Sequence, residues 1–290
     1  MWALVLIWAA NFSVVKAALV DFEPLAFNAT RFVLASALML VFLRHTDGLP
    51  RFRRSEWLAL IGLGLLGNAA YQVLFIFGID GTLAGNSALI LGTVPAYVAV
   101  LSSWLGHERL SKKTWLGVAL SLAGVGLVVW GSARVEFGQA TVRGDLLMVA
   151  AAIGWSLYTV GSSPLVRRYG ALPVTSVTLW IGTIGLLLVS TPSLSSQSWA
   201  PIRWASWAGL LYSGTLSIAV AYLLWYYGVR HMGSTRTALY SNTIPIVALA
   251  IAWLTLGEVP NGLQLLGAVA IVVGVSLSRT QRAEGGHGEP

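Results

Sequence analysis

The sequence predicts an all-α polytopic membrane protein with ten transmembrane helices, arranged as two inverted repeats of five helices each. Its 290 residues are 56% hydrophobic and 10% charged, and the mean hydropathy is +0.75. This composition is far from that of ordinary soluble domains. Residues 78–125 also match residues 228–275 at a constant offset of 150, so that Pro95 pairs with Pro245. Internal repeats in a membrane chain are typical of transporters.

The ten predicted spans are apolar segments of about 17 to 25 residues, which is the length needed to cross about 30 Å of hydrocarbon as a helix. Charged residues, Pro or Gly bound each of them. They cover residues 2–20, 25–43, 57–79, 84–105, 113–131, 145–163, 172–190, 204–228, 235–256 and 262–278. The first span has no basic flank or cleavage site, so it is interpreted as a retained helix. Because each repeat has an odd number of spans, the second repeat is predicted to lie upside down relative to the first.

The cations predict which way the chain crosses the membrane. If both termini are cytoplasmic, the outer loops hold only Arg134, Arg143 and Arg203. The inner loops and tail then hold the larger set: Arg44, Arg51, Arg53, Arg54, Arg109, Lys112, Lys113, Arg167, Arg168, Arg230, Arg236, Arg279 and Arg282. This asymmetry follows the positive-inside rule, and we expect a multi-pass protein of the cell inner membrane with both termini in the cytoplasm.

The composition also argues against several classes of function. The chain has no cysteine, and its histidines fall in predicted loops or the tail, so no metal site or other cofactor is expected. The net charge of +7 is spread singly between apolar runs, so nucleic acid is not an expected partner. No His, Cys, Asp or Glu is predicted at membrane depth, which argues against an enzyme. The G-x-G-x-x-G at residues 62–67 lies inside an apolar span, where it favours helix packing over nucleotide binding.

A doubled motif runs through both halves. Glu108 is followed by Gly117 and Gly124, and the same E-x8-G-x6-G-V pattern returns from Glu258. Other shared or early features are Pro95, Pro245, Trp8 to Asn11, Pro24 and Arg31-Phe32. Together these resemble the EamA family of the drug/metabolite transporter superfamily, and the chain is similar to its YddG-type aromatic amino-acid exporters. The resemblance implies export of small metabolites, often amino acids, across a bacterial inner membrane.

We therefore predict four segments: a first repeat at 1–131, an external linker at 132–144, a second, inverted repeat at 145–278, and a disordered cytoplasmic tail at 279–290. Small residues recur every three or four positions at Gly117, Ser121 and Gly124, and again at Gly267, Ala270 and Gly274. This pattern favours close helix packing, with a homodimer seam as the alternative. The oligomeric state is left open between monomer and homodimer.

Two cations lie inside predicted spans near the outer side, Lys16 and Arg31. Each either snorkels towards the headgroups, helped by Asp21 and Glu23, or faces a cavity as an anchor for an anion. Arg31 is the better anchor, because its planar guanidinium can hold both oxygens of a carboxylate. All acids, Asp145 included, fall in predicted loops, tails or span ends, and the first span offers Asn11. This argues against a carboxylate proton relay and against cation-for-proton exchange.

Neutral polar and aromatic side chains complete the candidate substrate site, because amides, phenols and rings can bind the ammonium, carboxylate and apolar parts of an amino acid. With the two cations, the candidate substrate-binding residues are Asn11, Lys16, Arg31, Tyr71, Gln72, Tyr97, Trp155, Tyr158, Tyr222 and Asn242. Pro95 and Pro245 lie in the middle of spans, where a proline removes a backbone hydrogen bond. They predict kinks that act as hinges.

These observations favour a transporter that moves small metabolites, most of all amino acids, aromatic ones included, by alternating access through a central cavity. The expected partners are a small-molecule substrate and the lipid bilayer. A nucleotide-sugar or phosphosugar antiporter is one alternative, although it would require more cavity cations, and a multidrug exporter is another.

Overall fold

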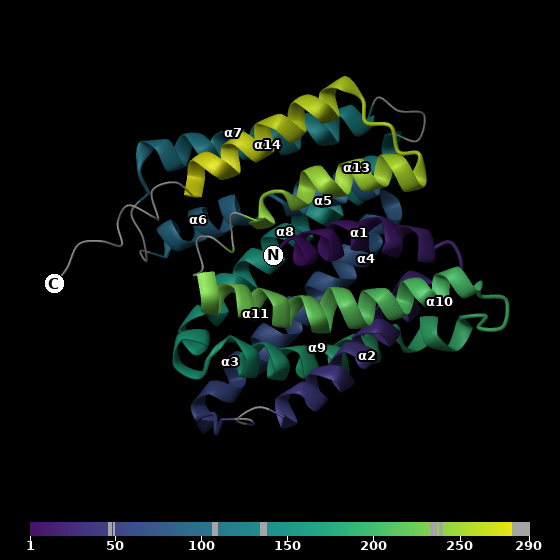
Figure 1. Ribbon diagram of the computed structural model, residues 1–290, viewed down its shortest axis with the longest axis vertical. Helices are drawn as coiled ribbons and strands as arrows, with labels where there is room; N and C mark the ends of the chain where they lie inside the picture. The colour runs from purple at the N-terminus through teal and green to yellow at the C-terminus, as the bar shows by residue number, and fades with distance from the viewer. Residues whose placement is uncertain are drawn as a thin grey trace.

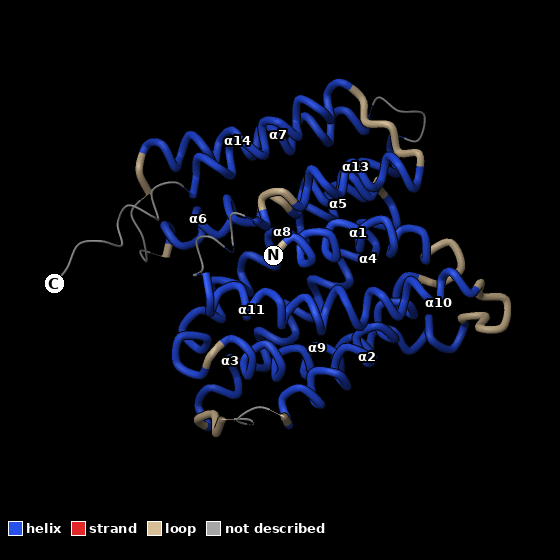
Figure 2. Tube along the Cα trace, in the orientation of Figure 1, coloured by secondary structure: helices blue, strands red, loops and turns tan. Residues whose placement is uncertain are grey.

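The computed structural model describes residues 1–45, 48, 50–105, 110–133, 138–232, 237 and 240–279. All regular secondary structure in these residues is helical (Figures 1 and 2). The predicted tail, apart from Arg279, and parts of the predicted linker and ninth span lie outside the described residues.

The first repeat contains five apolar helical spans, of which two are irregular. Its elements are α1 (Trp2–Ala18), α2 (Pro24–Arg44), the 3-10 turn η1 (Arg54–Glu56), α3 (Trp57–Leu65), the π-helix η2 (Leu66–Ala70), α4 (Tyr71–Gly81), α5 (Ala84–Leu91), α6 (Val94–Trp104) and α7 (Lys112–Ala133). The third span is thus one helix with a π-helical middle. The fourth is two helices, α5 and α6.

The second repeat follows the same plan. Its elements are α8 (Gly138–Tyr169), α9 (Ala171–Ser196), α10 (Trp204–Leu211), the π-helix η3 (Tyr212–Val220), α11 (Ala221–Met232), α13 (Ile244–Leu256) and α14 (Gly262–Arg279). At the offset of 150, η2 coincides with the last five residues of η3. Residues separated by half the chain therefore adopt the same rare helix type.

Seven of the described helical segments are long and apolar enough to cross a membrane, and three shorter apolar helices, Trp2–Ala18, Ile244–Leu256 and Gly262–Ser278, complete the ten. The structure thus agrees with the predicted ten-helix, two-repeat architecture. α8 begins at Gly138, before the predicted start of its span at residue 145 and inside the segment predicted to link the repeats.

Equivalent spans of the two repeats pack against each other. α2 lies against α9, α5 against α13, and α7 against α14. Figure 1 shows the α7 and α14 pair side by side at one edge of the bundle, with α1 and α4 near the middle of the view. Helices far apart in sequence are therefore interleaved, and neither repeat forms a separate bundle.

Glycines allow α7 and α14 to approach at backbone distance. A Cβ added to Gly117 would lie 2.5 Å from the carbonyl oxygen of Gly274, and one added to Gly124 would lie 2.7 Å from that of Gly267. The contacts are reciprocal, since Gly267 and Gly274 face the same partners. The small-residue pattern is therefore explained by packing within the chain, as predicted.

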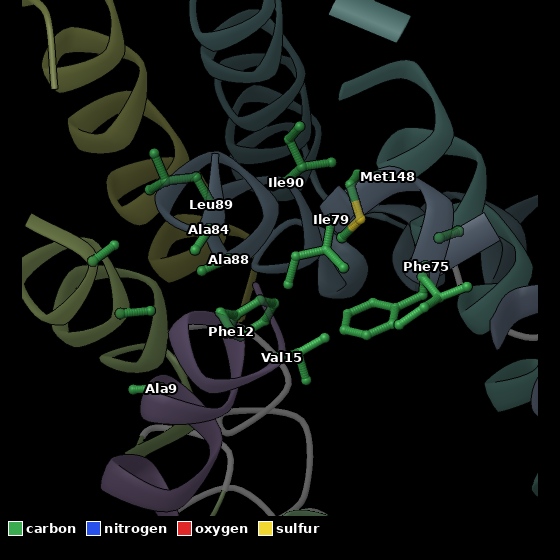
Figure 3. Close-up of a cluster of buried hydrophobic side chains, with 14 of the residues drawn as sticks. Ala9, Phe12, Val15, Phe75, Ile79, Ala84, Ala88, Leu89, Ile90 and Met148 are labelled. Carbon is green, nitrogen blue, oxygen red and sulfur yellow. The ribbon is translucent and has the colours of Figure 1, made fainter. Parts of the chain in front are cut away.

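A hydrophobic cluster fills the space between α1, α4, α5 and α8. Figure 3 shows Phe12 and Phe75 facing each other, and their ring centroids are 6.3 Å apart. Ile79 of α4 lies beside Met148 of α8, and both are fully buried. Gly78 makes this contact possible, because a Cβ there would meet the Met148 sulfur at 2.7 Å. This core fixes the helices that carry the candidate site.

Candidate functional site

Arg31 lies inside the bundle rather than at the headgroups. Only 2% of it is exposed. Its Nε donates to Asn28 Oδ1, its Nη1 to Ser213 Oγ and its Nη2 to Gln72 Oε1, each at 2.8 Å. The snorkelling interpretation is therefore wrong for Arg31. Its side chain turns inward, and its guanidinium donates hydrogen bonds to neutral groups from three spans.

Aromatic rings surround the same guanidinium. Its central carbon lies 5.3 to 5.7 Å from the ring centroids of Phe27, Phe32 and Phe75. The phenols of Tyr71 and Tyr222 lie within electrostatic reach. No carboxylate of the described residues pairs with Arg31. The charge is thus held by hydrogen bonds and cation–π contacts alone, which offset its desolvation only in part.

The partners of Arg31 connect it to both π-helices. Ser213 lies within η3, and Gln72 follows η2 by two residues. Asn28 also donates to the backbone carbonyl of Gln72 at 2.9 Å. Gln72 and Tyr222, both predicted site residues, are equivalent at the offset of 150. Arg31 therefore crosslinks α2 to the irregular spans of both repeats.

Each π-helix also receives an aromatic residue from the other repeat. Trp8 donates through Nε1 to the carbonyl of Ser217 in η3 at 3.0 Å. Tyr158 lies against Gly67 in η2, where a Cβ would overlap its ring. Residues 8 and 158, and likewise 67 and 217, are equivalent at the offset of 150. π-helical segments occur often at functional sites, so this reciprocal pair belongs to the candidate site.

Three of the predicted aromatic residues form a continuous row. The ring centroid of Trp155 is 5.0 Å from that of Tyr71 and 5.0 Å from that of Tyr158. Phe75 extends the row, with its ring 6.0 Å from Tyr71, and so connects it to Arg31. The structure thus brings together a cation and a row of adjacent, mutually tilted rings.

The predicted kinks at Pro95 and Pro245 are complete helix breaks. α5 ends at Leu91 and α6 begins at Val94, just before Pro95; α13 likewise begins at Ile244, just before Pro245. Thr93 and Thr243 close the two breaks identically, each hydroxyl donating to the carbonyl three residues earlier, at 2.6 and 2.7 Å. Gly92 packs on the Pro245 ring, since a Cβ there would lie 2.5 Å from Cγ. The two breaks therefore meet.

Three predicted residues border these breaks and the first span. Tyr97 is half-buried in the first turns of α6, and Asn242 lies in the break before α13. The Oδ1 atoms of Asn242 and of Asn11 in α1 are buried and have no hydrogen-bond partner. An unpaired buried acceptor is costly unless a ligand or water supplies a donor.

Lys16 belongs to a different part of the molecule from Arg31. Its Nζ donates to the carbonyl of Asp80 at 2.6 Å, at the end of α4. Asp21 and Glu23, its expected helpers, bind elsewhere. Asp21 accepts from Arg203 and Ser206, the Glu23 carboxylate accepts from Ser196, and the Glu23 amide donates to Oε1 of Gln197. Beside it, Glu258 accepts from the amides of Ala84 and Gly85 at 3.0 and 3.1 Å. Lys16 thus lies at the end of the bundle, with Glu258 capping α5.

Sequence reasoning missed several residues of these networks. Asn28 and Ser213 hold Arg31, yet nothing in their local sequence marks them. Asp145, predicted at a span end, is fully buried inside α8. No local sequence signal indicated this burial, because the predicted span began at residue 145 whereas α8 begins at Gly138. Among the described residues no cluster of His, Cys, Asp and Glu could hold a metal ion.

Known proteins resemble this chain over nearly its whole length. A transporter, YyaM, of Bacillus subtilis (strain 168), named as uncharacterized, is 30% identical over 92% of this chain and 88% of its own. A probable terminal-alkyne amino-acid exporter of Streptantibioticus cattleyicolor is 27% identical over 96% and 92%. A probable amino-acid metabolite efflux pump of Escherichia coli (strain K12) is 27% identical over 94% and 91%.

A solved crystal structure shares the fold, with a TM-score of 0.66 at 20% identity over 99% of this chain and 97% of that one. The sequence profile of the EamA-like transporter family matches residues 1–130 and again residues 142–280. Together with the ten helices in two repeats, this match makes the protein a multi-pass membrane transporter. The chain belongs to the EamA-like transporter family.

Proposed function

We propose that this transporter exports amino acids and related amphoteric metabolites across the cell inner membrane by alternating access. The observation that carries the proposal is the buried guanidinium of Arg31, whose described partners are all neutral. A guanidinium has five N–H donors, and three bonds leave two of them for a ligand. A substrate carboxylate would take these donors and neutralise the charge.

The surroundings suit the rest of an amino acid. The row of Tyr71, Trp155 and Tyr158 offers ring faces to an apolar or aromatic side chain. The unpaired amide oxygens of Asn11 and Asn242 are acceptors, and an ammonium group supplies donors. The names of the Streptantibioticus and Escherichia relatives, an amino-acid exporter and an amino-acid metabolite efflux pump, point to the same class.

Alternating access is supported by the paired breaks. A helix break concentrates bending in a few residues, and both breaks lie where the two repeats touch. Rocking one repeat against the other about this contact would expose a central site to each face in turn.

Flux in proteoliposomes tests the proposal. A panel of radiolabelled amino acids, sugar phosphates, nucleotide sugars and cationic drugs is loaded, and efflux is measured for each. Amino-acid efflux is the expected result. Exclusive transport of sugar phosphates, nucleotide sugars or drugs would overturn it and establish one of the alternatives.

Arg31→Gln tests the anchor itself. Losing a charge-assisted contact in a dry site costs about 1.5 to 3 kcal/mol, or roughly ten- to a hundredfold in affinity. Competition by an amino acid and by its carboxamide, which lacks the carboxylate charge but keeps the ammonium group, separates binding from folding. The wild type should prefer the acid and the variant should not. An unchanged preference in Arg31→Gln would eliminate the anchor. Lys16→Gln should have a smaller effect, and Arg203→Gln, at an exposed pair, serves as the control.

A further inference from the structure

Asp145 is a buried carboxyl that the transport proposal does not use. It lies about two turns inside α8 and is 0% exposed. Its Oδ1 accepts from the hydroxyl of Thr82 at 2.5 Å and from Nδ2 of Asn86 at 3.3 Å. Its Oδ2 is buried and has no hydrogen-bond partner. The two oxygens of one carboxyl thus have very different surroundings.

Thr82 lies in the turn between α4 and α5, residues 82 and 83, and Asn86 lies in the first turn of α5. Asn86 also donates to Ser132 of α7 at 2.7 Å and accepts from Gln264 of α14 at 3.0 Å. Gly144 lets the turn approach, because a Cβ there would overlap the backbone of Gly81. The carboxyl therefore joins this turn of the first repeat to the second repeat.

Few charges face this carboxyl from the helices packed around it. On α4 the acid is Asp80, an exposed residue whose carbonyl accepts from Lys16. α5 has no titratable residue, and the lysines of α7, Lys112 and Lys113, lie at its opposite end. Arg143 precedes Asp145 on α8 and is exposed, and Glu258 caps α5. None of these described groups bonds or pairs with Asp145.

The arrangement fits the neutral acid better than the ion. As an acid, Asp145 uses Oδ1 as a carbonyl that accepts two hydrogen bonds, while Oδ2 carries the proton. As an ion, it would bury a charged oxygen with no donor, which costs several kcal/mol. Protonation of Oδ2 also adds no heavy atom, so it needs no additional space in the packed site.

We propose that Asp145 is a proton-binding site, and that the proton must be bound for the turn between α4 and α5 to close against α8. Opening the turn removes Thr82 and Asn86, admits water, and lets the carboxyl release its proton to the adjoining solution. An ionised Asp145 then opposes reclosure. Protons on the face that carries this turn, predicted to be the outer one, therefore favour the closed state. This inference rests on the alternating-access part of the proposed function.

The test needs no substrate. In this naturally Cys-free chain, Ile79→Cys places a thiol in the interface between α4 and α8 (Figure 3). Its alkylation by an impermeant maleimide is measured in right-side-out and inside-out membrane vesicles at several pH values. Each rate is divided by that of an exposed cysteine on the face that the reagent reaches, Ser195→Cys in right-side-out and Ser55→Cys in inside-out vesicles, which removes the intrinsic pH dependence of thiol chemistry. The normalised rate should rise with pH on one face only, by at most tenfold per pH unit for one proton.

Two variants at Asp145 complete the design. Asp145→Asn imitates the neutral acid, so its normalised labelling should stay low at every pH. Asp145→Ala removes the link to the turn, so its labelling should stay high at every pH. A flat response in the wild-type background, a response from both faces, or a wild-type response in Asp145→Asn would overturn the proposal. Failure of amino-acid transport in proteoliposomes would leave these labelling results unaffected, so the two proposals fail separately.

Discussion

At the scale of single residues, the two halves use equivalent positions for different side chains. Position 8 is Trp and position 158 is Tyr, and each contacts a π-helix in the opposite half. The Trp8 contact is a hydrogen bond to a backbone carbonyl, whereas the Tyr158 contact is ring packing on Gly67. The duplicated fold therefore preserves the geometry of the contact while its chemistry has diverged.

Gly67→Ala should destabilise the protein through this contact. The added methyl overlaps the ring of Tyr158, and overpacking costs about 1 to 3 kcal/mol. Gly62→Ala is the control in the same span, because a Cβ there meets nothing within 4 Å and a helical Gly→Ala change is favourable by about 1 kcal/mol. Thermal unfolding in detergent should show a lower midpoint for Gly67→Ala alone. Equal midpoints for the two variants would contradict the packing argument.

Asp21 predicts an acid-sensitive contact between the first turn and α10. Hydrogen bonds from Arg203 and Ser206 lower the pKa of the Asp21 carboxyl. A lowered pKa contributes stability that is present above the unfolded-state pKa of about 3.9 and is lost as the pH falls through the folded-state pKa. Asp21→Asn should therefore be less stable than the wild type at neutral pH and equal to it in strong acid. A difference that stays constant with pH would disprove this.

At the scale of elements, the irregular helices are the repeated feature. Spans three and eight contain π-helices, and spans four and nine are broken two residues before their prolines. Irregular backbone at membrane depth is tolerated where protein or a cavity satisfies its polar groups. Thr93 and Thr243 satisfy one carbonyl at each break, so the breaks are stable features of the fold.

Pro95→Ala and Pro245→Ala should slow transport more than they weaken substrate binding. Restoring the missing amide favours a continuous helix, which shifts the balance between the inward- and outward-facing states without removing a ligand contact. The maximal rate of efflux should fall while the half-saturating concentration changes little. Pro192→Ala, near the exposed end of α9, is the matched control. Unchanged maximal rates in both variants would rule out the hinge role.

At the scale of the whole molecule, the interleaved repeats make both faces of the membrane depend on both halves. The turn of Asp21 contacts the start of α10, and at the opposite end Glu56 contacts Arg168 and Tyr169. Each contact joins the region where the first span of one repeat ends to the start of the third span of the other. The two contacts lie at opposite ends of the bundle, so chemical labelling from one side of the membrane can tell the two ends apart.

Single cysteines should establish which face is cytoplasmic. The charge asymmetry predicts that Ser55→Cys is protected from an impermeant thiol reagent added outside intact cells, whereas Ser195→Cys and Ser198→Cys react. All three side chains are exposed in the fold, so protection would reflect the membrane and not burial. Labelling of Ser55→Cys from outside would reverse the predicted orientation.

The sequence by itself determined the ten spans and the duplicated plan, because hydropathy is local and the offset of 150 is read directly from the chain. It also located Arg31, Gln72, Trp155 and the two prolines. The roles of these residues in transport remain predictions.

Tertiary structure decided what these residues contact. Arg31 meets Gln72 and Ser213 across 41 and 182 residues, and such pairings depend on how packed helices are rotated and shifted. Composition could not distinguish a snorkelling Arg31 from a buried one. The burial of Asp145 depended on where α8 begins and on the close approach of Gly144 to Gly81. Packing between distant segments, which no local pattern records, is the physical reason for both.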